Sequence, residues 1–327
     1  MNILEEVRDC RTIGISGHIN PDGDCVGSCM GMALYLEKAM PQARIDVFLE
    51  DFSEALERRI KGAEKIRHNY KTDVEHYDAF ICLDCEKERL GDALDFFMKS
   101  KKKINIDHHK TNAGCGDVNY VVPTASSACE LAYLSMEEER IDAETAQNLY
   151  IGMVTDTGVF AYSNTGRKTM EIAGKLITYG FDFSAIVREV FYEKTYVQQQ
   201  IFGRALLESV RFMDGRCIVS RIDRQTMRFY QATSKDMEGI AAELVHTEGV
   251  CCAIFMYAID PMSYKVSLRS TGEVDVAKLA KVYGGGGHGR AAGFTSNGTY
   301  HDIVNSLSPL IEEQLETGVR VRGHRNR

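Results

Sequence analysis

The sequence has little of the positive charge that binding to a long nucleic acid requires. Its 39 Lys and Arg residues are outnumbered by 47 Asp and Glu residues, which gives the 327-residue chain a formal net charge of −8. A groove that neutralises many phosphates needs an excess of basic side chains. We therefore expect no long duplex or long single strand as a ligand. Residues 260–327 carry nine Lys or Arg against seven Asp or Glu, so the acidic excess lies before them. This imbalance would suit a metal-binding part followed by an anion-binding part, but chance also explains it.

The sequence also lacks a long apolar run and the pattern of a secretory leader. The densest apolar run, residues 250–259, is about half the length needed to cross a bilayer. The first ten residues carry Glu5, Glu6 and Asp9 instead of a basic segment followed by an apolar one. We therefore expect a cytoplasmic protein without a membrane partner, in which the ten cysteines are reduced and mostly buried.

A second C-x-x-C pair is missing as well. Cys82 and Cys85 bracket Asp84, but no other cysteine pair has the matching spacing that a structural zinc site needs. We interpret them as thiols at the end of a strand and not as a zinc or redox site.

The apolar pattern that is present favours an α/β fold. Hydrophobic residues make up 44% of the chain, and short apolar runs alternate with helical patterns. Such alternation predicts right-handed crossovers and a mostly parallel sheet with flanking helices. The expected strands are residues 12–17, 44–49, 78–83, 103–106 and 118–122, and the expected helices are residues 26–40, 53–61, 86–99, 126–138 and 143–155.

The length suits two domains. We expect a larger domain over residues 1–190, a linker helix over 191–205 and a smaller α/β domain over 206–327. In the smaller domain, strands are predicted at 216–222, 250–258 and 265–269, with helices at 234–246 and 274–282.

Acidic and histidine residues gather where the expected strands of the larger domain end. In a parallel sheet, the working groups collect at the carboxyl ends of the strands. Each segment alone could equally be a solvated strand end. The residues concerned are His18, Asp22, Asp24, Asp84, Asp107, His108 and His109.

Asp156 follows an apolar helical run instead of a strand. A carboxylate in such a segment is costly to bury without a cation or several hydrogen-bond donors. A helix cap or a turn explains it equally well.

If Asp22, Asp24, Asp84 and Asp156 meet, the site needs cations. Two like charges at 4 Å repel by roughly 4 kcal/mol at an effective dielectric constant of 20. Two divalent ions would cancel four carboxylates, and mixed carboxylate and imidazole ligands suit Mn²⁺ or a similar first-row ion. The spacing of the residues does not show that they converge.

A glycine-rich stretch lies in the smaller domain, with six glycines between residues 284 and 293. Glycines permit positive φ and a close approach of backbone N–H groups to an anion. His288 and Arg290 could donate to a phosphate from this stretch. A merely flexible loop is the alternative.

Taken in order, these motifs resemble the DHH/DHHA1 phosphoesterase family, and within it the NrnA-like branch of nano-RNases and pAp phosphatases. The resemblance covers nearly the whole chain. It is carried by His18-x-Asn-Pro-Asp22-Gly-Asp24, Asp84, Asp107-His108-His109, Asp156 and the stretch from Gly284 to Phe294.

The resemblance implies a role for each residue. His18 and Asp22 would hold one metal ion, Asp24, His108 and Asp156 a second, and Asp84 would bridge both. Asp107 would orient a neighbouring imidazole, as partners of metal ligands usually do, and His109 would face the scissile phosphate. The substrate contacts would be His288, Arg290, Gly286, Gly287 and Arg269, with lesser contacts from Asn112 and Ser127.

The resemblance also implies an activity. We expect a two-metal hydrolase, with Mn²⁺ favoured over Co²⁺ or Mg²⁺ and the active site in a cleft between the domains. Its substrates would be short single-stranded RNA, linear dinucleotides such as pApA and pGpG, or pAp, and its products nucleoside 5′-monophosphates. A dinucleotide-binding sensor and a pyrophosphate or polyphosphate hydrolase are the alternatives. The substrate used in the cell, the polarity of cleavage and a homodimeric state are left open.

Overall fold

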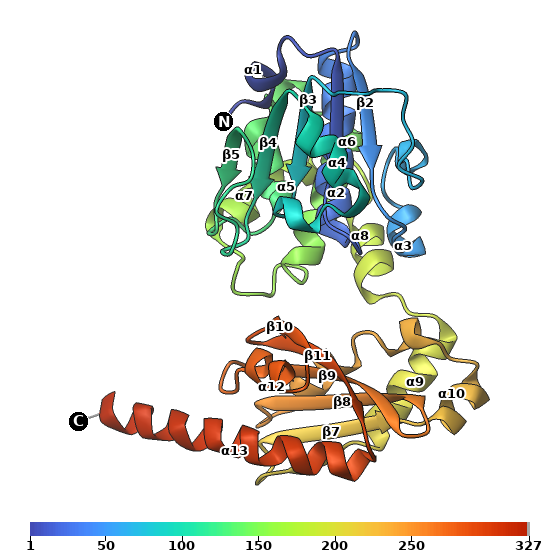
Figure 1. The fold of residues 1–327 in the computed structure, drawn as a ribbon, viewed down its shortest axis with the longest axis vertical. Coiled ribbons are helices and arrows are strands. Elements are labelled where there is room, and N and C mark those ends of the chain that lie inside the picture. The colour runs from blue at the N-terminus through green and yellow to red at the C-terminus, as the bar shows by residue number, and fades with distance from the viewer. Residues whose placement is uncertain (326–327) are drawn as a thin grey trace. The chain divides into compact units, whose positions relative to one another are not determined.

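The chain folds into two compact units, residues 1–193 and 194–327. The structure is a computed structural model, which describes the backbone of residues 1–325 and the side chains of residues 1–317. Each unit has a sheet and a core of its own (Figure 1).

A five-stranded parallel sheet with the order β2-β1-β3-β4-β5 forms the centre of the first unit. The predicted α/β class with a mostly parallel sheet is therefore confirmed. The strands are β1 (Thr12–Ser16), β2 (Arg44–Phe48), β3 (Ala79–Leu83), β4 (Lys102–Asp107) and β5 (Val118–Val121).

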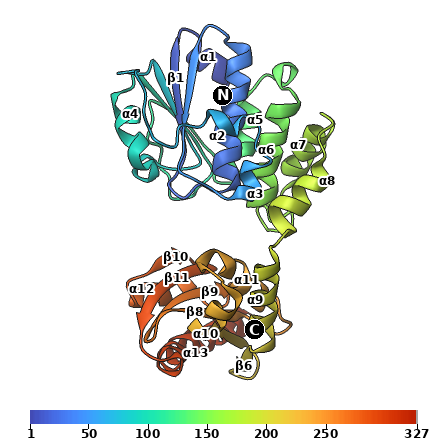
Figure 2. The ribbon, with the colours of Figure 1, turned by 90° about the vertical axis from the view of Figure 1, so that its right-hand side faces the viewer.

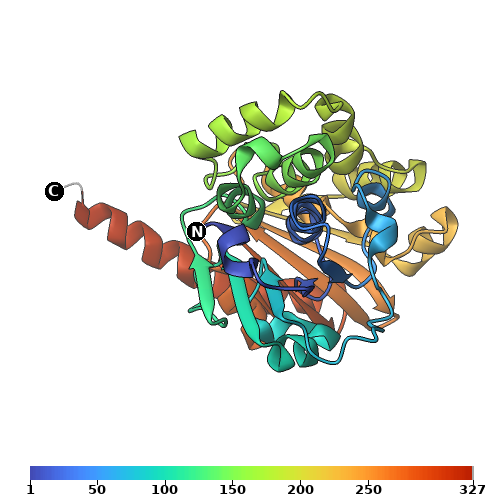
Figure 3. The same cartoon turned by 90° about the horizontal axis from the view of Figure 1, so that it is seen from above.

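Helices cover both faces of this sheet (Figures 2 and 3). One face packs Ile81, Leu83, Ile104 and Ile106 against the larger group of helices, and the other packs Phe80 and Cys82 against α4. Because side chains alternate along a strand, each buried strand serves both layers. The helices are α1 (Ile3–Val7), α2 (Gly23–Ala39), α3 (Glu54–Glu57), α4 (Leu94–Lys99), α5 (Ala128–Ser135), α6 (Ala143–Asp156), α7 (Arg167–Ile177) and α8 (Phe183–Ile186), followed by a π-helix, Val187–Tyr192.

Three predicted helices of the first unit are shorter than expected, and in the one predicted at 126–138 the α-helix is Ala128–Ser135. Only Glu54–Glu57 of the helix predicted at 53–61 is α-helical. In the stretch at 86–99, two 3₁₀ turns, Lys87–Arg89 and Gly91–Ala93, precede α4, and only α4 is α-helical. Gly91 has a φ of +53°, which a continuous right-handed helix does not tolerate. Further 3₁₀ turns lie at Ala63–Lys65 and Glu138–Arg140.

The second unit is a six-stranded sheet with the order β10-β11-β9-β8-β7-β6. Only β7 and β8 pair in parallel within this sheet, as the structure describes it. Its strands are β6 (Val210–Phe212), β7 (Cys217–Ile222), β8 (Cys252–Asp260), β9 (Ser263–Ser270), β10 (Gly286–His288) and β11 (Ala291–Asn297). Its helices are α9 (Tyr196–Leu207), α10 (Arg224–Tyr230), α11 (Ile240–Val245), α12 (Val276–Val282) and α13 (Tyr300–Arg325), with a 3₁₀ turn at Ser234–Met237.

The expected linker helix is not a separate segment. Helix α9 lies wholly within the second unit. Its buried residues Ile201 and Ala205 pack in one core cluster with Ile218 and Phe255 of the sheet. Residues four apart lie on one face of a helix, and here that face is apolar and covered by the second unit.

The helices and the cysteines can be compared with two further expectations from the sequence. Among the helices of the described residues, none is long and apolar enough to span a bilayer. All ten cysteines are free thiols, and eight of them are buried, as predicted from their positions beside strands and helices.

Candidate metal centre

The acidic and histidine residues that the sequence analysis singled out in the first unit meet at the carboxyl end of its sheet. His18 follows β1, Asp84 follows β3, and Asp107 is the last residue of β4. Asp22 caps the N-terminus of α2, and its carboxylate accepts from the backbone N–H groups of Asp24 and Cys25. Asp156 is the last residue of α6, so helices and strands both contribute to the cluster.

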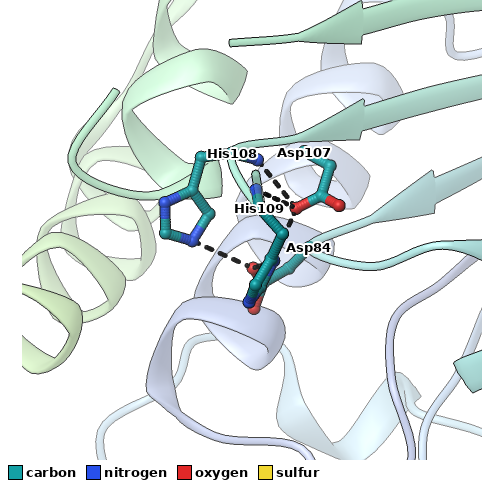
Figure 4. Close-up of side chains that lie close together, drawn as sticks. All are labelled: Asp84, Asp107, His108 and His109. Atoms are coloured by element: carbon teal, nitrogen blue, oxygen red, sulfur yellow. Dashed lines mark hydrogen bonds and ion pairs between the residues drawn. The ribbon is translucent and has the colours of Figure 1, made fainter. Parts of the chain in front are cut away.

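Asp84 lies in the middle of this cluster. Its two oxygens face different imidazoles: His18 Nε2 is 3.4 Å from Oδ2, and His108 Nε2 is 3.4 Å from Oδ1. Figure 4 shows His108 and His109 beside this carboxylate. Asp84 is buried and adopts a φ of +60°, a conformation that costs a non-glycine residue of order 1–3 kcal/mol and that clusters at functional sites.

The other carboxylates surround the same two imidazoles. His108 Nε2 lies 3.7 Å from Asp24 Oδ2 and 3.8 Å from Asp156 Oδ2. His18 Nε2 lies 3.7 Å from Asp22 Oδ1. Three groups of side chains offer ligand atoms within 4.8 Å of one another and could hold a metal ion: His18 with Cys25 and Asp84; Asp24 with His108 and Asp156; and Asp84 with Asp107, His108 and His109. The structure thus brings together all six residues that we expect to bind metal, and their role as ligands stays a prediction.

Asp24 is buried among backbone donors at the start of α5. It accepts hydrogen bonds from the backbone N–H groups of Ala128 (2.6 Å) and Cys129 (2.9 Å). Burial, together with the negative charges of Asp84 and Asp156, nevertheless holds the pKa of Asp24 well above its usual range.

The pKa of Asp156 is raised by the same kind of surroundings, namely burial and neighbouring carboxylates. Burial raises the pKa of Asp156 to about 6; the charge of His108 opposes this shift, and the charge of Asp84 adds to it. Asp84 Oδ1 is buried and has no partner in hydrogen-bond geometry among the described residues. An unsatisfied buried acceptor in a native site calls for an explanation, and a cation supplies one.

The pKa values of the two imidazoles are raised as well, which favours their charged form. Burial lowers the pKa of His108, but the nearby Asp84 carboxylate and the charges of Asp24 and Asp156 outweigh burial and raise the pKa to about 10. Burial also opposes protonation of His18, yet Asp22 and Asp84 raise its pKa overall. The imidazolium protons therefore balance the carboxylates, and a metal ion would displace them.

Asp107 holds the two histidines that follow it. Its Oδ1 accepts from His108 N (2.7 Å), His109 N (3.1 Å) and His109 Nδ1 (2.8 Å), as the dashed lines in Figure 4 show in part. Burial raises the pKa of Asp107, but the hydrogen bonds from His109 and Asn112 lower it overall. This arrangement suits the orienting role expected for Asp107.

The side chains of Asn112 and Ser127 form hydrogen bonds within the protein, and the contacts to substrate that we expect of them stay a prediction. Asn112 is buried and donates both amide hydrogens within the protein, to Asp107 Oδ2 (2.5 Å) and Asn105 Oδ1 (3.0 Å). Ser127 is also buried, and its hydroxyl caps α5 by accepting from Glu130 N. Asn112 therefore joins two other side chains, and Ser127 stabilises the start of a helix.

Asn164 is a site residue that the sequence did not reveal. Its Nδ2 lies 3.2 Å from Asp156 Oδ2 and 2.9 Å from Ser126 O. It follows a left-handed turn in which Val159 and Phe160 have φ values of 56° and 64°. Its position, eight residues after Asp156 in a turn, carries no spacing signal.

The predicted anion-binding glycine loop is a β-hairpin. Strands β10 and β11 pair Gly286 with Gly293 and His288 with Ala291. A β-carbon at Gly287 would lie 2.4 Å from Ala291 O, so close strand approach explains this glycine. His288 and Arg290 are exposed at the turn, and Arg269 on β9 pairs with Ala291. The three basic residues therefore lie at one end of the second sheet.

Two family models match this chain. The model of the DHH family, N-terminal domain, matches residues 12–153, and that of the DHHA1 domain matches residues 214–317. The chain belongs to the DHH/DHHA1 family. The matched regions contain all the candidate metal-binding and substrate-binding residues except Asp156, which lies just after the first region.

Relatives and a solved structure extend the match over most of the chain. The bifunctional oligoribonuclease and PAP phosphatase NrnA of Bacillus subtilis is 27% identical over 86% of this chain and 88% of its own length. A probable protein of the same description from Streptococcus mutans is 28% identical over 95% of this chain and 98% of its own length. The crystal structure of an exopolyphosphatase-related protein from Bacteroides fragilis has the same fold, with a TM-score of 0.87 at 24% identity over 97% of this chain and 96% of that one.

Proposed function

We propose that this chain is a metal-dependent phosphoesterase that hydrolyses short oligoribonucleotides and linear dinucleotides, such as pApA and pGpG, to nucleoside 5′-monophosphates, and pAp to AMP. The observation that carries this proposal is the buried Asp84 carboxylate, which faces imidazoles on both sides and has one unsatisfied oxygen among the described residues. Membership of the DHH/DHHA1 family and similarity to two NrnA relatives support the substrate class.

The donor set suits two divalent cations. His18 and Asp22 would hold one, Asp24, His108 and Asp156 the other, and Asp84 would contribute an oxygen to each. Oxygen and imidazole donors favour Mn²⁺ or a similar ion, with Co²⁺ and Mg²⁺ as alternatives. When bound, such ions supply Lewis acidity and make water a competent nucleophile at neutral pH.

His109 is the residue of this chain that we expect to act on the scissile phosphate. Asp107 accepts from its Nδ1 and raises its pKa, which favours the cationic form of the imidazole. A positioned cation stabilises negative charge that develops on a phosphoryl group. Asp107 also fixes the ring, because the same oxygen accepts from the His109 backbone.

The basic end of the second sheet would bind the substrate's phosphate. His288 and Arg290 are exposed on the β10–β11 turn, and Arg269 lies on the adjacent strand. Charge-assisted hydrogen bonds to phosphate are strong and, for arginine, geometrically specific. The backbone of Gly286 and Gly287 would contribute lesser contacts, as the family resemblance implies.

The buried thiols support action in a reducing compartment such as the cytoplasm. All ten cysteines are free, and Cys82 and Cys85 lie beside Asp84 with their sulfur atoms 3.7 Å apart. Proteins with free cysteine pairs are typical of compartments that keep thiols reduced.

A substrate panel tests the function. Metal-depleted protein would be reloaded with Mn²⁺, Co²⁺ or Mg²⁺ and given pApA, pGpG, longer oligoribonucleotides, pAp, pyrophosphate and polyphosphate. We expect metal-dependent turnover of the dinucleotides and pAp, and a fall in rate as the RNA lengthens. Preferred turnover of pyrophosphate or polyphosphate would replace the proposed substrate class. Tight dinucleotide binding without turnover by any metal would identify a sensor.

A further inference from the structure

Asn105 is a buried polar residue on β4 to which the family motifs assign no role. It is fully buried between Ile104 and Ile106, which point to the opposite face of the sheet. A primary amide without partners is costly in such a place. Asn105 has partners for both of its polar atoms, and each leads to the metal centre.

The amide nitrogen of Asn105 binds both sides of the Asp84 turn. It lies 3.2 Å from Cys82 O and 2.9 Å from Cys85 O. Between these carbonyls, Asp84 takes its left-handed conformation, with its own N–H bonded to Ile106 O at 3.0 Å. One amide group therefore spans the turn that presents the Asp84 carboxylate.

The amide oxygen of Asn105 leads toward His109. It accepts from Asn112 Nδ2 at 3.0 Å, and the same nitrogen lies 2.5 Å from Asp107 Oδ2. Asp107 in turn holds His109 Nδ1 at 2.8 Å. A continuous chain of hydrogen bonds thus runs from the Asp84 turn through Asn105, Asn112 and Asp107 to His109.

We propose that Asn105 is a positioning residue that fixes Asp84 and His109 relative to each other. It closes the left-handed turn on one side and supports the Asp107–His109 pair on the other. Buried hydrogen-bond networks in which every member is satisfied rigidify a site. Removing a residue that hydrogen-bonds to a metal ligand typically lowers metal affinity or activity by about 10–100-fold. The inference rests on the proposed function only for the identity of the reaction.

Asn148 provides a matched control for Asn105. It is equally buried, and its side chain also bridges backbone groups, accepting from Lys61 N at 2.8 Å and donating to Lys61 O at 3.0 Å. These bonds join α6 to the segment after α3 and do not lead to the metal centre. Comparing variants of the two residues therefore separates the effect of losing a buried amide from the effect of losing the positioning of Asp84 and His109.

The experiment compares Asn105→Asp with Asn148→Asp in the full chain. Each change keeps the shape of the side chain and replaces donors by an acceptor. We would measure thermal stability, Mn²⁺ affinity by calorimetry, and kcat and KM for pApA at saturating Mn²⁺. Both variants should melt at lower temperature. Only Asn105→Asp should lower Mn²⁺ affinity and kcat by about 10–100-fold, with KM changed by less than about threefold.

The inference is overturned if folded Asn105→Asp protein keeps wild-type kcat and Mn²⁺ affinity, or if Asn148→Asp lowers both to the same degree. Asn105→Ser, which keeps a small donor in the space, takes the place of Asn105→Asp if that variant does not fold, and the same criteria apply. If wild-type protein hydrolyses none of the proposed substrates, the proposed function fails, but the Mn²⁺ affinities still decide the role of Asn105.

A double-mutant cycle tests whether Asn105 acts on His109 through Asn112 or whether Asn105 and Asn112 act independently. Asn105→Ser and Asn112→Ser should each lower kcat, and the double variant should lose less than the product of the two factors, because residues in one hydrogen-bond network do not act additively. Simple multiplication of the two losses would show that Asn105 does not act on His109 through Asn112.

Discussion

Gly152 lies directly against Asp24. A β-carbon at Gly152 would come within 2.9 Å of Asp24 Oδ1 and 2.2 Å of Cys129 Sγ. Gly27 on α2 is equally close to α6, since a β-carbon there would lie 2.6 Å from Asn148 O. These glycines let α2, α5 and α6 approach until Asp24 and Asp156 face the same imidazole.

Gly152→Ala should therefore disturb both the core and the metal centre. Overpacking of a filled interior typically costs about 1–3 kcal/mol, and displacement of Asp24 should weaken Mn²⁺ binding. Gly174→Ala is the control, because a β-carbon added at Gly174, in α7, would meet no other segment of the described chain within 4 Å. That change should raise stability by up to about 1 kcal/mol and leave Mn²⁺ affinity unchanged. Chemical denaturation and calorimetry would check both variants, and equal behaviour would contradict the packing argument.

Asp84→Asn should abolish most of the activity. The change keeps the size of the side chain but removes the charge between the two imidazoles, so kcat for pApA with Mn²⁺ should fall on the order of a hundred- to a thousandfold. Asp46→Asn serves as the control: Asp46 is as deeply buried but binds Arg44, Arg67 and Tyr77 outside the site. It should lower stability without lowering kcat of the folded protein. An Asp84→Asn enzyme with the wild-type rate would rule out the proposed role of Asp84.

Asp107→Asn distinguishes an orienting role from metal ligation. The new amide would present a donor toward Asn112 or His109, and either placement breaks a hydrogen bond. We expect kcat to fall by about 10–100-fold while the number of bound Mn²⁺ ions, measured by elemental analysis, stays unchanged. Loss of an ion would show that Asp107 is itself a ligand.

Arg290→Ala should affect substrate binding alone. Losing a charge-assisted hydrogen bond of about 1.5–3 kcal/mol corresponds to a rise in KM for 5′-phosphorylated dinucleotides of roughly 10–100-fold. kcat and metal content should stay constant. Lys235→Ala removes an exposed positive charge elsewhere in the second unit and should change none of these quantities. Metal loss in Arg290→Ala would refute this division of roles.

Metal binding should release protons, and Mn²⁺ affinity should rise with pH. In the metal-free protein the pKa of Asp156 is raised to about 6 and that of His108 to about 10. A metal ion must displace the proton on His108 and, toward pH 6, the proton on Asp156, so lowering the pH favours the metal-free state. Calorimetry at pH 7 in buffers of different ionisation enthalpy should report at least one proton released per protein, chiefly from His108. Affinity that does not change between pH 6 and 8 would contradict this account.

Much of the first unit could be predicted because its signals are local. Runs such as β3 are apolar throughout, since parallel strands are buried on both faces, and a carboxylate directly after such a run marks the working edge of the sheet. The break at Gly91 could not be predicted because its positive φ is visible only in the folded backbone. The hairpin formed by the glycine stretch was not predicted either. Its glycines are needed because a neighbouring strand packs closely against them, and composition does not reveal that strand.

The sequence by itself determined which residues could bind metal, that all of them except Asp156 would lie near the ends of parallel strands, and the family to which the chain belongs. Only the tertiary structure decided that Asp24, Asp84 and Asp156 share the imidazole of His108, because that convergence depends on how closely glycine-lined helices pack. It also decided that Asn112 turns inward to Asp107 while Asn164 reaches Asp156. Hydrogen bonds between distant segments are set by packing geometry, and the identity of an asparagine does not specify its partner.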